Sequence, residues 1–161
     1  MKRRTFLQTS GIIGSATILS KPSLGQNQLA NEPIIIATWK NEKGTKSGWD
    51  KMMQTGRALD GVEAGAWIPE ADPNETSVGY GGLPDRDGHV TLDACIMDHL
   101  GNAGSVTFLE GIMHPISVAR AVMEKTPHVM LSGAGALQFA LSQGFKQQNL
   151  LTEKSKKAWE A

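Results

Sequence analysis

A turn-rich stretch at residues 77–88 constrains the fold of this chain more than any other feature. Its sequence, SVGYGGLPDRDG, is dense in glycine, proline and aspartate, the residues that favour turns and interrupt regular structure. Neither a helix nor a strand is expected to continue through it. Helical spacing of apolar residues precedes the stretch, and alternating segments follow it, so we expect a layered α+β fold.

Before this stretch, the sequence predicts one strand and two helices. The run PIIIATW at residues 33–39 is short, apolar and β-branched, as is typical of a buried strand. Residues 41–48 are rich in lysine and glycine, which indicates a loop. The remaining expected elements are a helix over 48–59 capped by Ser47 and a helix over 60–68, ended by Pro69 and Pro73.

After the stretch, the sequence predicts strands and helices in alternation. Proline in the first turn, glycine after the last turn and threonine at the N-cap mark the helix ends. The expected elements are strands over 89–98 and 104–110 joined by a turn at Gly101-Asn102, a helix from Pro115 to Lys125, a strand over 128–131, a helix over 134–143 and a final helix capped by Thr152.

The composition excludes several classes of protein. The 161 residues carry 16 basic and 16 acidic side chains, which argues against a nucleic-acid-binding protein. A single cysteine, Cys95, excludes an internal disulfide framework and a multi-cysteine zinc site. No apolar run reaches the roughly 18–20 residues of a membrane-spanning helix.

The neutral total hides a division at the N-terminus. Residues 1–25 contain four basic residues and no acidic one, which leaves the rest of the chain with a net charge of −4. The charged start Lys2-Arg3-Arg4, the weakly apolar run 12–19 and the small residues at 23–25 follow the order of an export signal. Residues 3–8 (RRTFLQ) resemble the twin-arginine consensus, although a basic N-terminus could contain paired arginines by chance. We expect a signal over 1–25, a mature domain over 26–161, and a periplasmic or secreted protein without a membrane anchor after signal removal.

The common catalytic and metal-binding motifs are absent from the sequence. It contains no HExxH, GxSxG, P-loop or CxxC motif. The four histidines lie on different segments without ligand spacing, so no metal site is expected. Residues 79–82 (GYGG) precede strands and do not open a helix, which argues against a dinucleotide site. We therefore expect no cofactor.

Four single residues have both a structural and a functional interpretation. Asp93 and Asp98 are five positions apart and would point to opposite faces of a strand, which argues against a carboxylate pair. One of them is expected to be a structural hydrogen-bond acceptor. Cys95, beside Ile96 and Met97, is expected to be a small buried hydrophobe. Trp39, at the end of the first predicted strand, is either a core residue or the wall of a site.

Two long motifs resemble the glycosylasparaginases. Residues 77–85 (SVGYGGLPD), Gly88 and residues 91–98 (TLDACIMD) form the first, and residues 115–131 (PISVARAVMEKTPHVML) form the second. The resemblance extends from about Ile34 to the end of the chain. These enzymes are N-terminal-nucleophile amidohydrolases related to plant-type asparaginases and isoaspartyl peptidases, and the Gly-Gly-x-Pro-Asp form favours the glycosylasparaginase branch.

The resemblance implies a fold and a precursor that is cut into two halves. The fold is a four-layer αββα sandwich, of which this chain supplies part. The precursor cuts itself at an Asp-Thr or Gly-Thr bond, and the new N-terminal Thr is the nucleophile, with its own α-amine as general base. This sequence has no Asp-Thr, and its one Gly-Thr, Gly44-Thr45, lies near the start. We therefore expect no catalytic residue in this chain and a C-terminal half as its partner.

Two positions carry over from the family's pattern, and three regions depart from it. Trp39 matches the Trp that lines the substrate pocket, and Ser77 matches a Ser that supports the nucleophile. Leu83 stands where an Arg is usual, Ala134 replaces an Asp, and residues 40–48 do not follow the pattern.

The resemblance leads to a functional expectation with two alternatives. The expected reaction is hydrolysis of the amide between N-acetylglucosamine and the asparagine side chain, performed by a dimer of αβ units. One alternative is an isoaspartyl peptidase or L-asparaginase of the same fold. The other is a truncated or decayed family member without activity.

Overall fold

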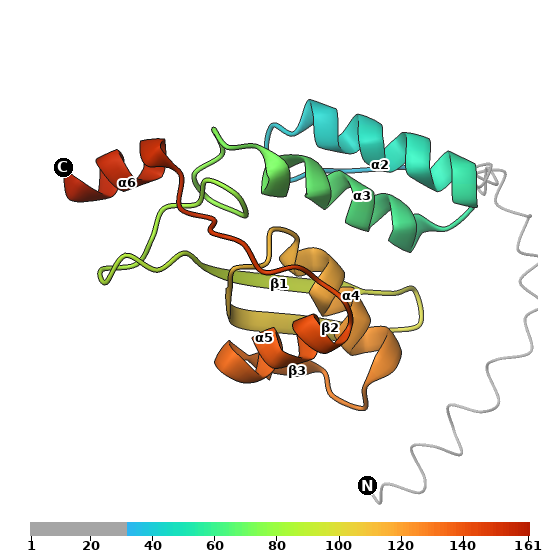
Figure 1. Ribbon diagram of the computed structural model, residues 1–161. Coiled ribbons are helices and arrows are strands. Elements are labelled where there is room, and N and C mark those ends of the chain that lie inside the picture. The colour runs from blue at the N-terminus through green and yellow to red at the C-terminus, as the bar shows by residue number, and fades with distance from the viewer. Residues whose placement is uncertain (1–31) are drawn as a thin grey trace, which may run out of the picture. The chain divides into compact units, whose positions relative to one another are not determined.

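The chain folds as an α+β structure, which confirms the coarser fold prediction. The computed structural model describes residues 32–161, and residues Ile35–Ala161 form one compact unit (Figure 1). Within it, a pair of helices is followed by a three-stranded sheet that carries further helices. The elements are α2 (Glu42–Thr55), α3 (Ala58–Ala71), β1 (Thr91–Met97), β2 (Ala103–Glu110), α4 (Pro115–Lys125), β3 (Met130–Ser132), α5 (Gly133–Ser142) and α6 (Glu153–Glu160).

Helices α2 and α3 pack against each other through glycines. A side chain on Gly48 would place its Cβ 2.6 Å from the carbonyl oxygen of Gly61, and one on Gly61 would lie 2.7 Å from that of Gly48. One turn away, a Cβ on Gly65 would lie 3.0 Å from the carbonyl oxygen of Gly44. The two helices therefore approach backbone to backbone, and the four-residue glycine spacing places the glycines on one face of each helix.

Helix α2 begins earlier than predicted, and the loop expected over 41–48 is wrong. Asn41 is the N-cap, since its side chain accepts a hydrogen bond from the backbone N–H of Gly44. Ser47 is not a cap but donates to the carbonyl of Ala64 in α3 at 3.3 Å. Helix α3 likewise continues through Pro69 to Ala71. Glycine and proline suggested irregular backbone. In the structure, Gly44 and Gly48 instead form the contact between α2 and α3, and Pro69 lies in the last turn of α3.

The predicted strand over 33–39 is also wrong for this structure. The segment is extended but pairs with no described strand, and the side chains of Ile34 and Ile36 are 76% and 82% exposed. Ile35 points the other way and contacts the helix pair, since its Cδ1 would lie 2.6 Å from a Cβ on Gly48. The alternation typical of a strand is present, but only one of its two faces is covered.

The elements predicted after residue 88 are confirmed, with small shifts at their ends. Strands β1 and β2 form an antiparallel hairpin, and β3 pairs with β2 in parallel. Helix α4 connects β2 to β3, and Pro115 occupies its first turn. Helix α6 begins after Thr152, whose side chain accepts a hydrogen bond from the N–H of Ser155, as the sequence predicts.

A bulge interrupts the hairpin where Asp93 stands. Between the pairs Leu92–Leu109 and Ala94–Val106, one residue of β1 faces two residues of β2. The Asp93 carboxylate accepts hydrogen bonds from the N–H of Phe108 and the hydroxyl of Thr107, at 2.8 and 2.7 Å. Asp93 thus replaces the ladder bond that the bulge removes, which confirms its predicted structural role.

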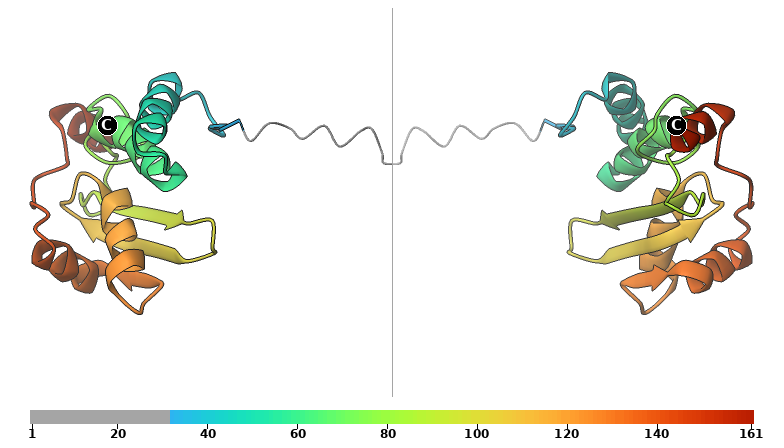
Figure 2. Two further views of the ribbon diagram at one scale, coloured as in Figure 1. Left: turned by 90° about the vertical axis from the view of Figure 1, so that its right-hand side faces the viewer. Right: turned by 90° about the vertical axis from the view of Figure 1, so that its left-hand side faces the viewer.

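The core lies between the sheet and helices α4 and α5, and Figure 2 shows α4 lying across the hairpin. The sheet's opposite face is open, because Asp93, Cys95 and Met97 on β1 are exposed while Leu92 and Ile96 are buried. Cys95 is therefore exposed, and the prediction that it is buried is wrong. Between residues 32 and 161, none of the helices has the length and apolar character needed to cross a membrane. The buried core residues are Ile96, Val106, Leu109, Ile112, Ile116, Val118, Ala119, Val122, Ala136 and Ala140.

The glycine contact between α2 and α3 makes a stability prediction. Gly48→Ala should lower the free energy of unfolding by about 1–3 kcal/mol, because the added methyl group meets backbone atoms that cannot move aside. Gly135→Ala is the matched control, since Gly135 lies in α5 with open space around its Cβ position. That variant should gain about 0.5–1 kcal/mol from helix propensity. Denaturant unfolding measures both, and equal effects would contradict the close helix approach.

Candidate functional site

The two residues carried over from the family's pattern lie at the same end of the α2–α3 pair. Trp39 precedes the start of α2, and Ser77 follows the end of α3. Because the two helices run antiparallel, with Gly44 beside Gly65 and Gly48 beside Gly61, the start of one lies next to the end of the other. The structure shows no direct contact between Trp39 and Ser77.

Trp39 lines a shallow pocket over the helix pair. Its side chain is 61% exposed, so it is not a core residue in this structure. The pocket has a volume of about 240 Å³, with the extended segment on one side and small residues of α2 and α3 on the other. An exposed indole beside a mostly apolar depression can contact a ligand, as expected of a pocket wall. The pocket residues opposite the extended segment are Asn41, Gly44, Thr45, Gly61, Val62, Gly65 and Ala66.

The glycine-rich loop, residues 79–82 (GYGG), is held tightly against the end of α3. Gly79 has a φ of +57°, and a Cβ there would lie within 2.6 Å of the backbone of Glu70. The next residue, Tyr80, donates its N–H to the carbonyl oxygen of Glu70 at 2.7 Å. Only glycine satisfies both the backbone conformation and the close approach at position 79.

Ser77 is exposed and engaged in a local turn. Its N–H and its hydroxyl both donate to Oε1 of Glu75, at 3.1 and 2.7 Å. These bonds hold the pKa of the Glu75 carboxyl below its ordinary value. While the Ser77 hydroxyl donates to Glu75, its oxygen can still accept a hydrogen bond from another group.

Beneath the loop, helices α3 and α4 meet along what we call the polar seam. On α3 it consists of Asp60, Glu63, Trp67 and Glu70, which share one face because they are spaced by three, four and three residues. On α4 it consists of Ser117, Arg120 and the first turn with its preceding residue, His114. Every described seam side chain bonds across the interface. The links are Arg120 to Asp60 and Glu63, Ser117 to Glu63 and Trp67, and Glu70 to His114 and Ile116.

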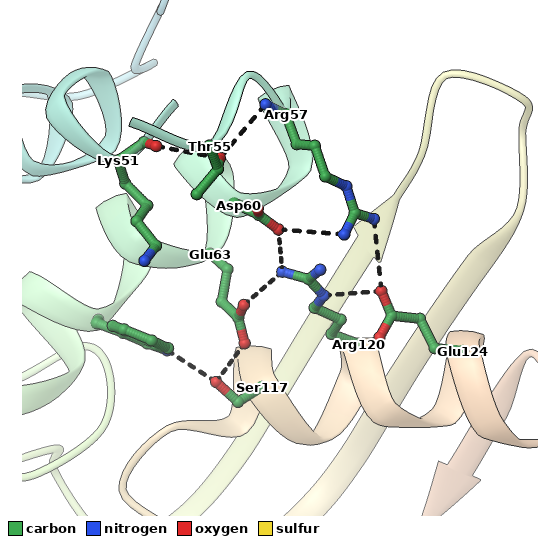
Figure 3. Close-up of polar contacts among 9 residues, drawn as sticks. Lys51, Thr55, Arg57, Asp60, Glu63, Ser117, Arg120 and Glu124 are labelled. Carbon is green, nitrogen blue, oxygen red and sulfur yellow. Dashed lines mark hydrogen bonds and ion pairs between the residues drawn. The ribbon is translucent and has the colours of Figure 1, made fainter. Parts of the chain in front are cut away.

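Arg120 carries the densest part of the seam (Figure 3). Its guanidinium lies 2.8 Å from Asp60, 2.7 Å from Glu63 and 2.9 Å from Glu124, and only 14% of the side chain is exposed. Burial disfavours the charged forms of Asp60 and Arg120, but hydrogen bonds and opposite charges outweigh this effect. The hydrogen bonds and charge of Arg120 lower the pKa of Asp60, and the three carboxylates raise the pKa of Arg120. Arg57 is a weaker partner, 3.8 Å from Asp60 and 4.0 Å from Glu124.

Glu70 closes the other end of the seam and joins it to the glycine-rich loop. Its side chain is buried, with Oε2 3.0 Å from Nδ1 of His114 and Oε1 accepting the N–H of Ile116 at 3.1 Å. The second bond satisfies an N–H in the first turn of α4 that has no partner within the helix. Burial raises the pKa of the Glu70 carboxyl, and these bonds offset that effect only in part.

The remaining sequence candidates do not form a reactive site. Asp98 accepts the N–H groups of Leu100 and Asn102 in the hairpin turn, each at 2.9 Å, so it is a turn residue. Exposed Cys95 lies on the open face of β1. Over the part of the chain that the structure describes, no group of three or more His, Cys, Asp or Glu residues is arranged to hold a metal ion.

The polar seam was not predicted from the sequence. Its signal is nevertheless present, because Asp60, Glu63, Trp67 and Glu70 recur at helical spacing. The predicted helix rested on the spacing of its apolar residues, and its predicted end at residue 68 excluded Glu70. A polar helix face that packs against another helix differs from a solvent-exposed face only in its partners. Here those partners lie 44 to 60 residues further along the chain.

Comparison with known proteins identifies the family. The Asparaginase_2 family model, described as asparaginase, matches residues 22–161. The chain belongs to this family. It is 54% identical over 98% of its length to an N(4)-(β-N-acetylglucosaminyl)-L-asparaginase of Elizabethkingia miricola. It is 40% identical over 77% of its length to the protein of that name from Mus musculus, and 38% identical over 86% to an isoaspartyl peptidase/L-asparaginase of Rattus norvegicus.

The family assignment confirms the resemblance drawn from the two motifs. This asparaginase-family chain spans 48%, 36% and 40% of these three relatives, about half of their length or less. The expected signal at residues 1–25 lies outside the described residues. The roles of Trp39 and Ser77 stay predictions.

The raised pKa of Glu70 makes a prediction about pH. The folded state holds the Glu70 proton more tightly than the unfolded state does. The resulting stability is complete below the carboxyl's ordinary pKa of 4.5 and is lost as the pH rises through the raised value. The free energy of unfolding of the wild type, minus that of Glu70→Gln, should therefore fall as the pH rises above 4.5.

Glu75→Gln is a control of opposite sign. Because the pKa of Glu75 is lowered in the folded state, its contribution is present above the ordinary pKa and is lost at acid pH. The free energy of unfolding of the wild type, minus that of Glu75→Gln, should therefore rise with pH. Urea unfolding over a pH series measures both, and a rising difference for Glu70 would contradict the burial argument.

Proposed function

We propose that this chain is the α-subunit portion, residues 26–161, of a glycosylasparaginase-like amidohydrolase. The observation that carries the proposal is the 54% identity to the Elizabethkingia miricola relative, which extends over 98% of the chain. The relative's name states the reaction, cleavage of the amide that joins N-acetylglucosamine to the side chain of asparagine. The identity to the isoaspartyl peptidase/L-asparaginase of Rattus norvegicus is lower, at 38%.

In this proposal the reaction is shared between two halves. A Thr at the start of the second half attacks the side-chain amide carbon through its hydroxyl oxygen, and its α-amine takes the proton. The glycosylamine leaves with a proton and an acyl-enzyme ester forms. Water then hydrolyses the ester and releases aspartate. This chain contributes Trp39 as a wall of the substrate pocket and Ser77 as a support for the Thr nucleophile.

Exposed apolar side chains on this chain support the proposal that a partner half binds to it. The face of β1 with Cys95 and Met97 is open, and Met97 is 66% exposed. Ile34 and Ile36 are still more exposed, on a segment whose sequence is typical of a buried strand. A C-terminal half that completes a four-layer αββα sandwich would cover these apolar groups. Two such αβ units would form the dimer, and the charged N-terminus would direct it to the periplasm or outside the cell.

The proposal predicts which combination of chains is active. The 161-residue chain alone should show no amidase activity, because the Thr nucleophile belongs to the other half. Joined to the remaining portion of the Elizabethkingia miricola relative, it should release aspartate from N-acetylglucosaminyl-asparagine. Aspartate release by the isolated chain would contradict the proposal.

The same chimera separates the alternatives. Faster turnover of β-aspartyl dipeptides than of the glycosylated substrate would indicate an isoaspartyl peptidase. A folded chimera that turns over neither substrate would indicate a non-catalytic family member. The unmodified Elizabethkingia miricola protein is the positive control for each assay.

Trp39 provides a site-specific prediction within the chimera. Trp39→Ala should raise KM about tenfold or more, because an aromatic wall of the pocket is lost. Its effect on unfolding should be small, since the side chain is 61% exposed. Trp49→Ala is the matched control, because Trp49 is a partly exposed Trp of α2 outside this pocket. Equal effects on KM would exclude a pocket role for Trp39.

A further inference from the structure

The C-terminal segment of the chain makes an unusual set of contacts with the glycine-rich loop. We call residues 148–160 the C-terminal strap. Its Leu150 is 2% exposed and packs with Val90 and Leu92, and Gln148 donates its N–H to the carbonyl of Gly111 at 2.8 Å. These contacts attach the strap to the sheet immediately before it reaches the loop.

Both backbone polar groups of Gly81 are bonded to the strap. The N–H of Gly81 donates to the carbonyl of Leu150 at 3.0 Å, and its carbonyl accepts the hydroxyl of Ser155. Ser155 is completely buried, although serine is usually found at the surface. Its hydroxyl also accepts a hydrogen bond from Thr152, whose side chain caps α6. The first turn of α6 is thus built around the bond to Gly81.

Gly81 is also closely packed against the turn that follows α3. Its φ is +108°, and a Cβ there would lie 2.7 Å from the carbonyl oxygen of Pro73 and 3.1 Å from that of Glu75. The residue is therefore enclosed between the turn after α3 and the strap. A change in the position of the strap would move Gly81 or leave its carbonyl without a partner.

The position of Gly81 is transmitted to Ser77 by the closure of the loop. The N–H of Leu83 donates to the carbonyl of Thr76 at 2.9 Å, and that of Gly82 donates to Gly79 at 3.2 Å. Gly81 lies inside both of the turns that these two bonds close. The backbone on either side of Ser77 is consequently fixed by the Thr76–Leu83 closure and by the contact of Gly81 with the strap.

We propose that Ser155 is a positioning residue that holds the glycine-rich loop, and with it Ser77, in the conformation that the active site requires. The proposal rests on the proposed function, in which Ser77 supports the nucleophile. Ser155 itself touches neither Ser77 nor the pocket wall at Trp39. Its effect passes through the Gly81 carbonyl.

The first test uses hydrogen exchange of the 161-residue chain. Ser155→Ala should accelerate exchange of the amides of residues 79–83 by about tenfold, because a buried carbonyl loses its hydrogen-bond partner. The amides of β2 in the core should accelerate by less than twofold. Ser142→Ala is the matched control, since it removes a serine bond to the carbonyl of Phe139 on the exposed surface of α5. It should leave the loop amides unchanged.

The second test uses the chimera with the Elizabethkingia miricola portion. Ser155→Ala should lower kcat about tenfold with KM within twofold, because the loop supports the nucleophile and not substrate binding. Ser155→Thr keeps the hydroxyl and should recover most of kcat. A change in KM alone, or a Thr variant as slow as the Ala variant, would overturn the positioning role.

The two tests fail independently. Loop amides that do not accelerate, or that accelerate no more than those of β2, overturn the proposal whatever the activity of the chimera. A chimera with wild-type Ser155 that shows no turnover counts against the proposed function. The exchange result on the chain alone then still decides whether Ser155 holds the loop.

Discussion

The polar seam between α3 and α4 is the interaction on which the remaining structure depends. Helix α3 meets α4 through charged and hydrogen-bonded side chains, and Leu59 and Ala66 of α3 also pack against the core. Arg120 holds two carboxylates of α3 within 2.8 Å, and each member of the seam has a partner. Partly buried charges are stable only when they are paired. Losing Arg120 would leave carboxylates facing one another, so the seam specifies one orientation of the helix pair, whereas an apolar contact would tolerate several.

Glu70 connects the polar seam to the glycine-rich loop. Its side chain caps α4, and its backbone carbonyl accepts the N–H of Tyr80. From the opposite side, the C-terminal strap bonds both polar groups of Gly81. Adjacent loop residues are therefore bound to two elements far apart in the sequence, Tyr80 to α3 and Gly81 to the C-terminal strap. A loop with little side-chain mass obtains a defined shape from its backbone partners, and glycine is needed because those partners approach so closely.

The elements after the loop could be predicted from sequence because their signals are local. Pro115 and Thr152 mark helix starts, and strand alternation defines the hairpin. The errors before the loop have a different origin. Glycine at positions 44 and 48 suggested a loop, but only the glycines at 61 and 65 across the interface explain them as a helix contact. The same holds for the seam, where Glu63 and Arg120 are separated by 57 residues. Such pairings depend on tertiary contacts that no local window contains. The proposed roles of Trp39 and Ser77 come only from the resemblance to the family, and their position at one end of the helix pair was not predicted.

The failed strand prediction at residues 33–39 and the exposed face of β1 have a common physical meaning. Both are places where the sequence places apolar side chains and the described residues provide no cover. A run such as Ile34, Ile35 and Ile36 is typical of a strand covered on both faces, yet only Ile35 contacts the helix pair. Met97 and Phe108 are exposed on strands that also supply Ile96, Val106 and Leu109 to the core. Large exposed apolar groups on two separate strand-like segments indicate an interaction surface. The chain spans about half the length of its relatives or less, and the second half that we propose as its partner would bury this surface.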